Sequence, residues 1–273
     1  MQIHAGYEIE YDCPQDTPML LVLSVHPSRL PDVIGPHQIV FDPPVGATEY
    51  RDGFGNICHR IVAPAGRLKI STSFLVSDPG TSDVVAPDAR QHPVQDLPDE
   101  VLVHLLGSRY CDTDRFTDIA WSLFGPTPPG WARVQAICDY VHDRIAFGYE
   151  HADPTRTAWS AHAEQRGVCR DFAHLAITLC RCMNIPARYC TGYLGDIGIP
   201  PVPYPMDFSA WFEAYLGGHW HTFDARHNTP RIGRILMARG RDATDVALAT
   251  TFGRCTLASF NVVTDEHRVS RRC

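Results

Sequence analysis

The sequence lacks an excess of positive charge and a long hydrophobic run, and each absence excludes a class of protein. Lys and Arg total 24 against 31 Asp and Glu, which gives a formal net charge of -7. A nucleic-acid-binding protein needs a basic surface that displaces phosphate counterions, so we expect no nucleic-acid partner. The longest apolar run, residues 19–23, is far shorter than the ~20 residues of a transmembrane helix, so we expect no membrane partner either.

The sequence also lacks C-x-x-C cysteine pairs, and we expect no secretory signal peptide. The ten cysteines are scattered and form no C-x-x-C pair, which argues against a zinc ribbon. The first residues show no basic stretch followed by an apolar one, which is the pattern of a secretory signal peptide. We therefore expect a cytoplasmic protein whose cysteines are reduced and serve as small buried apolar side chains. The oligomeric state is left open.

The residues that are present predict a strand-rich first domain. Hydrophobic residues make up 44% of the 273 residues, enough for one large domain or two modest ones. Apolar and polar residues alternate at 2–11 and again at 68–76, the period of a half-buried strand. Further short strands are separated by turn formers such as those at 52–56. We predict a β-sandwich over residues 1–80, followed by a linker over the proline-containing segment 81–98.

Residues 99–273 are predicted to form an α+β core domain, because the hydrophobic period changes after residue 98. Helices are expected at 99–106, 113–124 and 131–145, and a fourth begins near Cys169. Strands are expected at 188–193, 208–216 and 219–225, with Gly217 and Gly218 as the hairpin turn between the last two. Helices followed by antiparallel strands predict an α+β fold rather than a βαβ one.

Cys169 is the candidate nucleophile because it falls at the start of the fourth helix. Unpaired backbone N–H groups and the positive end of the helix dipole favour a thiolate there, and Arg170 adds positive charge. The same N–H groups suit an oxyanion that forms during acyl transfer. The competing interpretation is one more buried cysteine. Asp171, in the first helical turn, is expected to complement the dipole.

Several motifs together resemble the transglutaminase-like superfamily. They are GVCRDFA at 167–173, IPARY at 185–189, TGY at 191–193, AWFEAY at 210–215, Trp220 and Phe223-Asp224. The resemblance implies a thiol enzyme with a papain-like core behind an N-terminal β-domain. It assigns Cys169 as nucleophile and Asp224 as the acid that orients the base. It also implies amide or peptide hydrolysis or acyl transfer on a peptide, protein or small amide, with no cofactor.

The base is where the chain departs from the resemblance. The family has His-Ala-Trp on the first hairpin strand, whereas this chain has Ser209 before Ala210 and Trp211. A serine hydroxyl is no base at neutral pH and forms no imidazolium that would activate a thiol. The alternative to an enzyme is therefore a binding or scaffold protein that keeps the fold without the reaction.

Other histidines are candidates for a substitute base. His162 precedes Cys169 and His227 follows Asp224, each in a segment of unknown path. His219 and His221 alternate onto the strand face opposite Asp224, so they reach it only past a bulge. The pair also has the spacing of two metal ligands, a weak signal without a third. His174 lies about 140° around the helix from Cys169 and is not expected to contact it.

Three further segments give expectations. The proline-rich residues 194–207 lead into Ser209 and are expected to form a loop that covers the site. The tail 264–273 gives no clear signal and is expected to be loosely ordered. The segment 226–241 is rich in arginine and is expected to be solvated or paired internally, with an acidic partner surface as the alternative; the residues are Arg226, Arg231, Arg234, Arg239 and Arg241.

Overall fold

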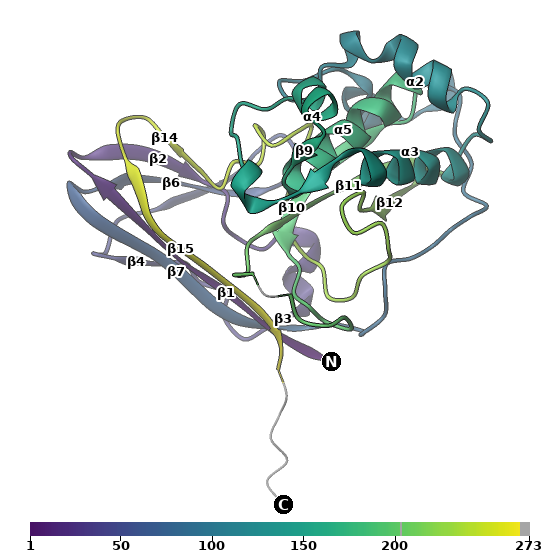
Figure 1. Ribbon diagram of the computed structural model, residues 1–273. Helices are drawn as coiled ribbons and strands as arrows, with labels where there is room; N and C mark the ends of the chain where they lie inside the picture. Colours follow the sequence, from purple (N-terminus) through teal and green to yellow (C-terminus); the bar gives the residue numbers. More distant parts are fainter. Residues whose placement is uncertain (203, 268–273) are drawn as a thin grey trace, which may run out of the picture.

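The chain forms a β-sandwich and an α+β core, in a computed structural model that describes residues 1–202 and 204–267 (Figure 1). The α+β fold with a strand-rich N-terminal part confirms the predicted fold class. No helix of the described residues is long and apolar enough to cross a membrane.

The sandwich consists of two antiparallel sheets. The first has the order β15-β1-β7-β3, with β4 also paired to β7; its strands are β1 (Gln2–Cys13), β3 (Val33–Ile34), β4 (Val40–Asp42), β7 (Gly66–Ser77) and β15 (Thr256–Glu266). The second has the order β14-β2-β6-β5; its strands are β2 (Thr17–Leu21), β5 (Thr48–Arg51), β6 (Ile57–Ala63) and β14 (Ala249–Thr251). The alternation in β1 buries Ile3, Ala5, Tyr7 and Ile9 between the sheets.

The sandwich is not confined to residues 1–80, because its last two strands come from the end of the chain. β15 pairs with β1 along its length, from Ile3 opposite Glu266 to Asp12 opposite Thr256, and β14 pairs with β2. A boundary that assigns all of 99–273 to the core therefore misplaces these strands. Residues 264–266, expected to be loosely ordered, lie in β15, and the N–H of His267 donates to the carbonyl of Gln2. The rest of that predicted tail, 268–273, lies outside the described residues.

Cys13 and Cys255 form a disulfide, which corrects the expectation that all cysteines are reduced. Their Cα atoms are 4.4 Å apart although 242 residues separate them in the sequence. The pairing of β1 with β15 is the reason, since it brings the end of one strand beside the start of the other. The other cysteines of the described residues are free thiols.

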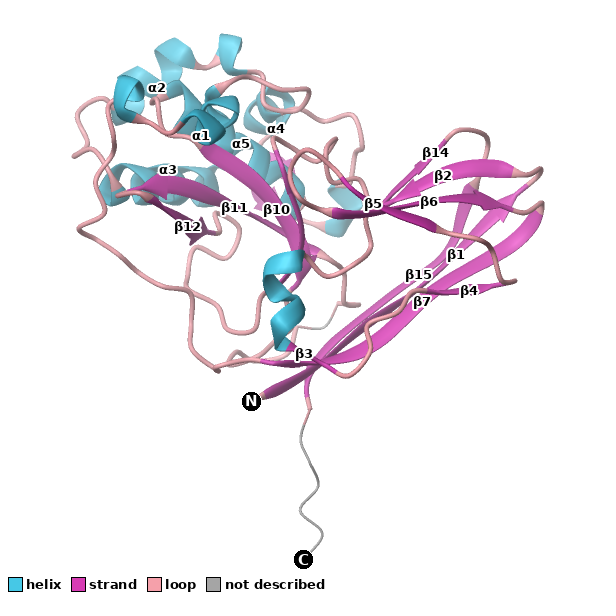
Figure 2. Ribbon diagram, turned by 180° about the vertical axis from the view of Figure 1, so that it is seen from behind, coloured by secondary structure: helices cyan, strands magenta, loops and turns pink. Residues whose placement is uncertain are grey.

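The core is an antiparallel sheet with helices on one face (Figure 2). The sheet has the order β12-β11-β10-β13; its strands are β10 (Ala187–Tyr193), β11 (Ser209–Leu216), β12 (His219–Phe223) and β13 (Ile235–Gly240). The helices are α1 (Asp99–Leu102), α2 (Thr117–Phe124), α3 (Trp131–Arg144), α4 (Ala158–Glu164) and α5 (Cys169–Cys182). Gly217 and Gly218, with φ of 59° and 86°, form the predicted β11–β12 turn.

Short elements fill the connections. They are the parallel pair β8 (Ala146–Phe147) and β9 (Arg166–Gly167), and the 3-10 helices η1 (Pro27–Asp32), η2 (Val94–Asp96), η3 (Val103–Leu105), η4 (Thr113–Arg115) and η5 (Tyr149–His151). η1 lies between the sandwich and the core sheet, as the short helix near β3 in Figure 2 shows. The N–H of its capping residue His26 donates to the carbonyl of Leu236 in β13.

Helix α5 is the central element of the core. It packs against β10 and β11 on one side and against α2, α3 and α4 on the other. Residues 171–182 are buried all round, as expected of a helix enclosed within a domain. This burial fixes the position of the helix start, where Cys169 lies.

Candidate active site

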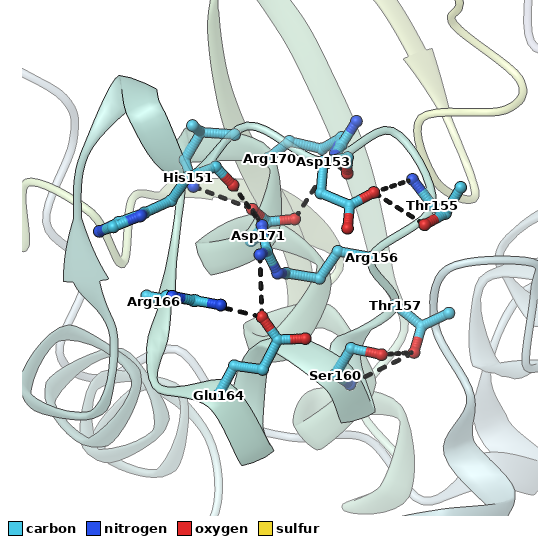
Figure 3. A network of polar contacts seen from close by, with 11 residues as sticks. His151, Asp153, Thr155, Arg156, Thr157, Ser160, Glu164, Arg166, Arg170 and Asp171 are labelled. Atoms are coloured by element: carbon cyan, nitrogen blue, oxygen red, sulfur yellow. Dashed lines mark hydrogen bonds and ion pairs between the residues drawn. The ribbon is translucent and has the colours of Figure 1, made fainter.

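The start of α5 is held by a network of charged side chains around Asp171 (Figure 3). Asp171 Oδ2 accepts a hydrogen bond from the N–H of Val168 at 2.9 Å, which caps the helix. The guanidinium groups of Arg156 and Arg170 lie 3.5 Å and 3.4 Å from the carboxylate. Asp171 therefore caps the helix as well as placing negative charge at its positive end.

The same network ties the α5 start to the segments before it. Arg156 also pairs with Glu164 of α4 at 2.9 Å and donates to the carbonyl of His151. Gly167 is required at its place, because a Cβ atom there would lie 2.6 Å from Asp171 Oδ2. Burial raises the pKa of Asp171, against the influence of the Val168 N–H, Arg170 and Arg156.

Cys169 is half-buried at the first position of α5. Burial raises the pKa of its thiol to about 11. The guanidinium of Arg226 and the N–H of Ala210 oppose this rise, whereas the carboxylates of Asp207 and Asp224 add to it. The thiol is thus protonated at neutral pH in the free protein, which differs from the thiolate that its helix position predicts.

The positive charge at the thiol comes from Arg226 and not from Arg170. The Arg170 side chain is directed to Asp171, to the carbonyl of Asp153 and to the ring of Tyr110. Arg226 instead lies with its guanidinium carbon 3.7 Å from the centre of the Phe147 ring. Arg226 carries no catalytic pattern in the sequence; its only signal is its place two residues after Asp224.

Asp224 follows β12 directly and is buried, at 7% exposure. Its Oδ1 accepts the N–H groups of Arg226 and His227, each at 3.1 Å, which closes a turn. Its Oδ2 lies 2.8 Å from His227 Nδ1 and 2.9 Å from Arg234 Nη2. Burial acts to raise the pKa of Asp224, but Arg234 and His227 together hold it below its ordinary value.

The imidazole beside Asp224 is therefore that of His227. Ser209 begins β11 and is buried at 7% exposure, opposite Gly192 of β10. It occupies the position where the resemblance places the histidine. His227 comes from the loop after β12 and remains 22% exposed at its side chain.

The other candidate histidines are engaged elsewhere. His162 Nε2 lies 2.7 Å from the Tyr140 hydroxyl, and its ring packs edge-on against Phe116. His221 Nε2 lies 3.2 Å from the carbonyl oxygen of Leu216. His174 is fully buried, and its Nε2 accepts the N–H of Ala243. These contacts lead away from the Asp224 carboxylate.

The loop 194–207 reaches the site through Tyr204 and Asp207; its Pro203 lies outside the described residues. The Tyr204 ring lies 5.8 Å from that of Tyr149, which in turn contacts Phe147. Asp207 acts electrostatically on the Cys169 thiol. Burial raises the pKa of this carboxyl above its ordinary value. The sequence predicts the loop's place but not this carboxyl group.

No metal centre is formed in the part of the chain that the structure describes. Within residues 1–202 and 204–267, no three His, Cys, Asp or Glu side chains are grouped as a metal ion requires. The pair His219 and His221 gains no third ligand. What the arrangement offers is a thiol, a carboxylate–imidazole pair, a guanidinium and backbone N–H donors.

Comparison with solved structures finds proteins that are similar to this chain to different degrees. A crystal structure of a "putative cysteine protease" from Cytophaga hutchinsonii has a TM-score of 0.84 and 28% identity, covering 99% of this chain and 92% of that one. The periplasmic domain of TgpA from Pseudomonas aeruginosa is 14% identical with a TM-score of 0.40, over 82% and 90% of the two chains.

One curated relative and one family description also match. An uncharacterised protein of Mycobacterium leprae is 40% identical over 85 residues, which are 30% of this chain, and the match spans 30% of the length of that relative. Residues 119–225 match the sequence model of the transglutaminase-like superfamily, a superfamily of thiol enzymes. The segment 119–225, which lies within the α+β core beside the β-sandwich, is therefore similar to the transglutaminase-like superfamily.

Proposed function

We propose that this protein is a thiol enzyme that hydrolyses an amide or transfers its acyl group, with Cys169 as nucleophile and His227 as base. The observation that carries this is the 2.8 Å contact between His227 Nδ1 and the Asp224 carboxylate. It supplies a carboxylate-oriented imidazole although the family's usual position holds Ser209. Substrates of this chemistry are peptides, proteins or small carboxamides. The cytoplasmic location stays a prediction.

The reaction follows from the roles of these groups. Cys169 Sγ attacks the amide carbonyl carbon while its proton passes to His227 Nε2, because the thiol is protonated at rest. The developing oxyanion is stabilised by N–H donors at the start of α5 and at Ala210. His227 then returns the proton to the leaving amine, and a thioester remains. Attack by water gives the acid, whereas attack by an amine gives the new amide; either one restores the thiol.

Asp224 positions His227 and does not itself take the proton. Its two oxygens hold the ring nitrogen Nδ1 and the backbone of the same turn. The second imidazole nitrogen is thereby left for the thiol. The ion pair with Arg234 keeps the carboxylate charged. The oriented imidazole is one part of what a cysteine–histidine–aspartate enzyme requires, and it supports the proposal.

The test compares histidine variants on two probes, denatured casein and a glutaminyl peptide with added hydroxylamine. New amino termini report peptide cleavage, ammonia reports carboxamide attack, and hydroxamate reports transfer. We expect Cys169→Ala to abolish product and His227→Gln to lower the rate by about 100-fold or more. His221→Gln, the matched control on the neighbouring strand, should retain the rate within about twofold. Full activity of the His227→Gln enzyme would show that this imidazole is not the base.

Two observations favour the scaffold alternative, namely the raised pKa of the Cys169 thiol and the serine at position 209. The Ser209→His variant separates the two functions. An inactive wild-type protein that gains activity on this substitution would be a binding protein that retains the fold. An active wild-type protein whose activity depends on His227 would be the enzyme proposed above.

A further inference from the structure

A cavity of about 310 Å³ lies on the face of the core sheet turned away from α5. Trp211 and Glu213 of β11 line it, whereas the alternating residues Ala210, Phe212 and Ala214 belong to the hydrophobic core that includes α5. Its opposite wall comes from η1 and the segment 78–84. Four arginine side chains line the same space: Arg29, Arg231, Arg234 and Arg239.

Arg234 has a hydrogen-bond donor without a partner in this cavity. Its side chain is 7% exposed. Nε donates to Asp83 and Nη2 to Asp224, each at 2.9 Å. Nη1 is buried and makes no hydrogen bond. A buried donor left unpaired costs about 1–3 kcal/mol, so this nitrogen calls for an acceptor.

Arg231 likewise has a buried hydrogen-bond donor without a partner, and it forms no ion pair with a carboxylate of the described residues. The residue is 4% exposed, its Nη2 donates to the carbonyl of Gly195 at 2.9 Å, and its Nε is buried without a partner. No ion pair of the described residues includes it. Burial, followed by the charge of Arg234, lowers the pKa of Arg231. Its guanidinium therefore lies near that of Arg234 without a direct ion pair, although the carboxylates of Asp224 and Asp196 act on it from a distance.

The carboxylates around the cavity are already taken. Asp78 pairs with Arg29 at 3.3 Å, and Asp83 pairs with Arg234 at 2.9 Å. Glu213 pairs with Arg188 at 2.6 Å and with Arg239 at 3.3 Å. None of these groups forms an ion pair with Arg231. The lining itself holds four arginines against three carboxylates, and it keeps unpartnered N–H donors on Arg231 and Arg234.

We propose that this cavity binds a small oxyanion, of the phosphate or carboxylate class, between Arg231 and Arg234. The planar guanidinium presents paired N–H donors that match the oxygen spacing of such anions. The volume suits a small molecule rather than a polymer. The anion would occupy the side of Arg234 opposite Asp224. Anion binding can be measured without the reaction at Cys169, although Arg234 also pairs with Asp224.

The test is titration calorimetry of the intact protein with inorganic phosphate, succinate and chloride at one ionic strength. We expect saturable binding of phosphate or succinate and none of chloride, and a melting temperature that rises with the bound anion. A response to phosphate alone assigns the phosphate class, and a response to succinate alone assigns the carboxylate class. Absence of saturation with both overturns the proposal.

Variants locate the site. Arg231→Gln should weaken binding by about tenfold or more, because it removes the unpaired charge. Arg241→Gln is the matched control, since Arg241 is 41% exposed, pairs with Asp245 and lies outside the cavity. Should the Arg231→Gln variant not fold, Arg231→Lys, which keeps the charge but removes the paired N–H donors, serves in its place. Equal affinity in the cavity variant and the Arg241 control would overturn the proposal.

Discussion

Cys169 is subject to two opposing influences. The first turn of α5 offers N–H donors and the positive end of a dipole, which favour a thiolate. Burial favours the neutral thiol. Burial has the larger effect, because the pKa of the Cys169 thiol is raised to about 11. In the proposed reaction, Cys169 would therefore need a base during attack. This is why the identity of the neighbouring imidazole matters more here than in a site with a preformed thiolate.

The raised pKa of Cys169 predicts the pH profile of its alkylation. In the free protein, the rate of carbamidomethylation by iodoacetamide should increase about tenfold per pH unit and level off only near the thiol pKa of about 11. Mass spectrometry of the peptide that contains residue 169 measures this rate. The Cys169→Ser protein supplies the background from other thiols. A plateau at neutral pH would contradict the raised pKa and indicate a resting thiolate–imidazolium pair.

Sequence reasoning singles out two members of the candidate site, leaves His227 among several histidines and does not point to Asp207 or Arg226. Cys169 and Asp224 stand out by their position at element ends and by resemblance. His227 remained one of several candidates, because the path of the loop after β12 depends on the turn that Asp224 closes with its own Oδ1. The spacing D-x-x-H after a strand is the signal that would favour it. Asp207 and Arg226 reach the thiol only through tertiary packing.

At the scale of elements, local periodicity predicts strands but not their partners. The sequence predicts β1, β7 and the β11–β12 hairpin, because the alternating pattern or the turn residues of each lie within one short segment. β15 was missed because it is largely exposed, so its residues carry little alternation. Its pairing with β1 joins segments from opposite ends of the chain. The misplaced domain boundary has the same cause.

The disulfide beside this pairing predicts a redox effect on stability. Reduction of Cys13–Cys255 should lower the free energy of unfolding by about 2–4 kcal/mol, because the cross-link restricts the unfolded chain. Urea denaturation with and without dithiothreitol measures the change. The Cys13→Ser/Cys255→Ser protein should resemble the reduced wild type and show no response to dithiothreitol. A wild-type protein equally stable under both conditions would contradict the cross-link.

At the scale of the whole molecule, the two domains share their packing. The sandwich core includes Tyr193, Ile235 and Met237 from the core sheet.

Buried histidines add a second property of the whole molecule. Burial lowers the pKa of His26 to about 4 and those of His104 and His174 to about 3. All three rings are therefore neutral in the folded protein at pH values where the unfolded chain would protonate them.

These histidines predict that stability falls in mild acid. An unfolded histidine binds a proton below about pH 6.5, whereas these rings do not until about pH 4 or 3. Their contribution is therefore fully present above the unfolded pKa and is lost as the pH falls below it, by up to about 1.4 kcal/mol per pH unit for each ring. Urea unfolding between about pH 7 and pH 5 measures this dependence.

Single variants test the assignment. His104→Phe should lower the slope of unfolding free energy against pH by about the contribution of one histidine. The ring of His104 contacts Phe54 and Trp220, and its Nδ1 has no hydrogen-bond partner. The exposed His219 provides the control, and His219→Gln should leave the slope unchanged. An unaltered slope in the His104 variant would mean that this ring accepts a proton in the folded protein.

The order in which the strands are synthesised has a consequence for how the protein assembles on the ribosome. Cys13 leaves the exit tunnel 242 residues before Cys255, and the whole segment 119–225 emerges between them. During that interval the edge of β1 that later pairs with β15 has no neighbouring strand. An unpaired strand edge can hydrogen-bond to other chains. The sandwich is thus completed only after the segment 119–225 of the core has been synthesised.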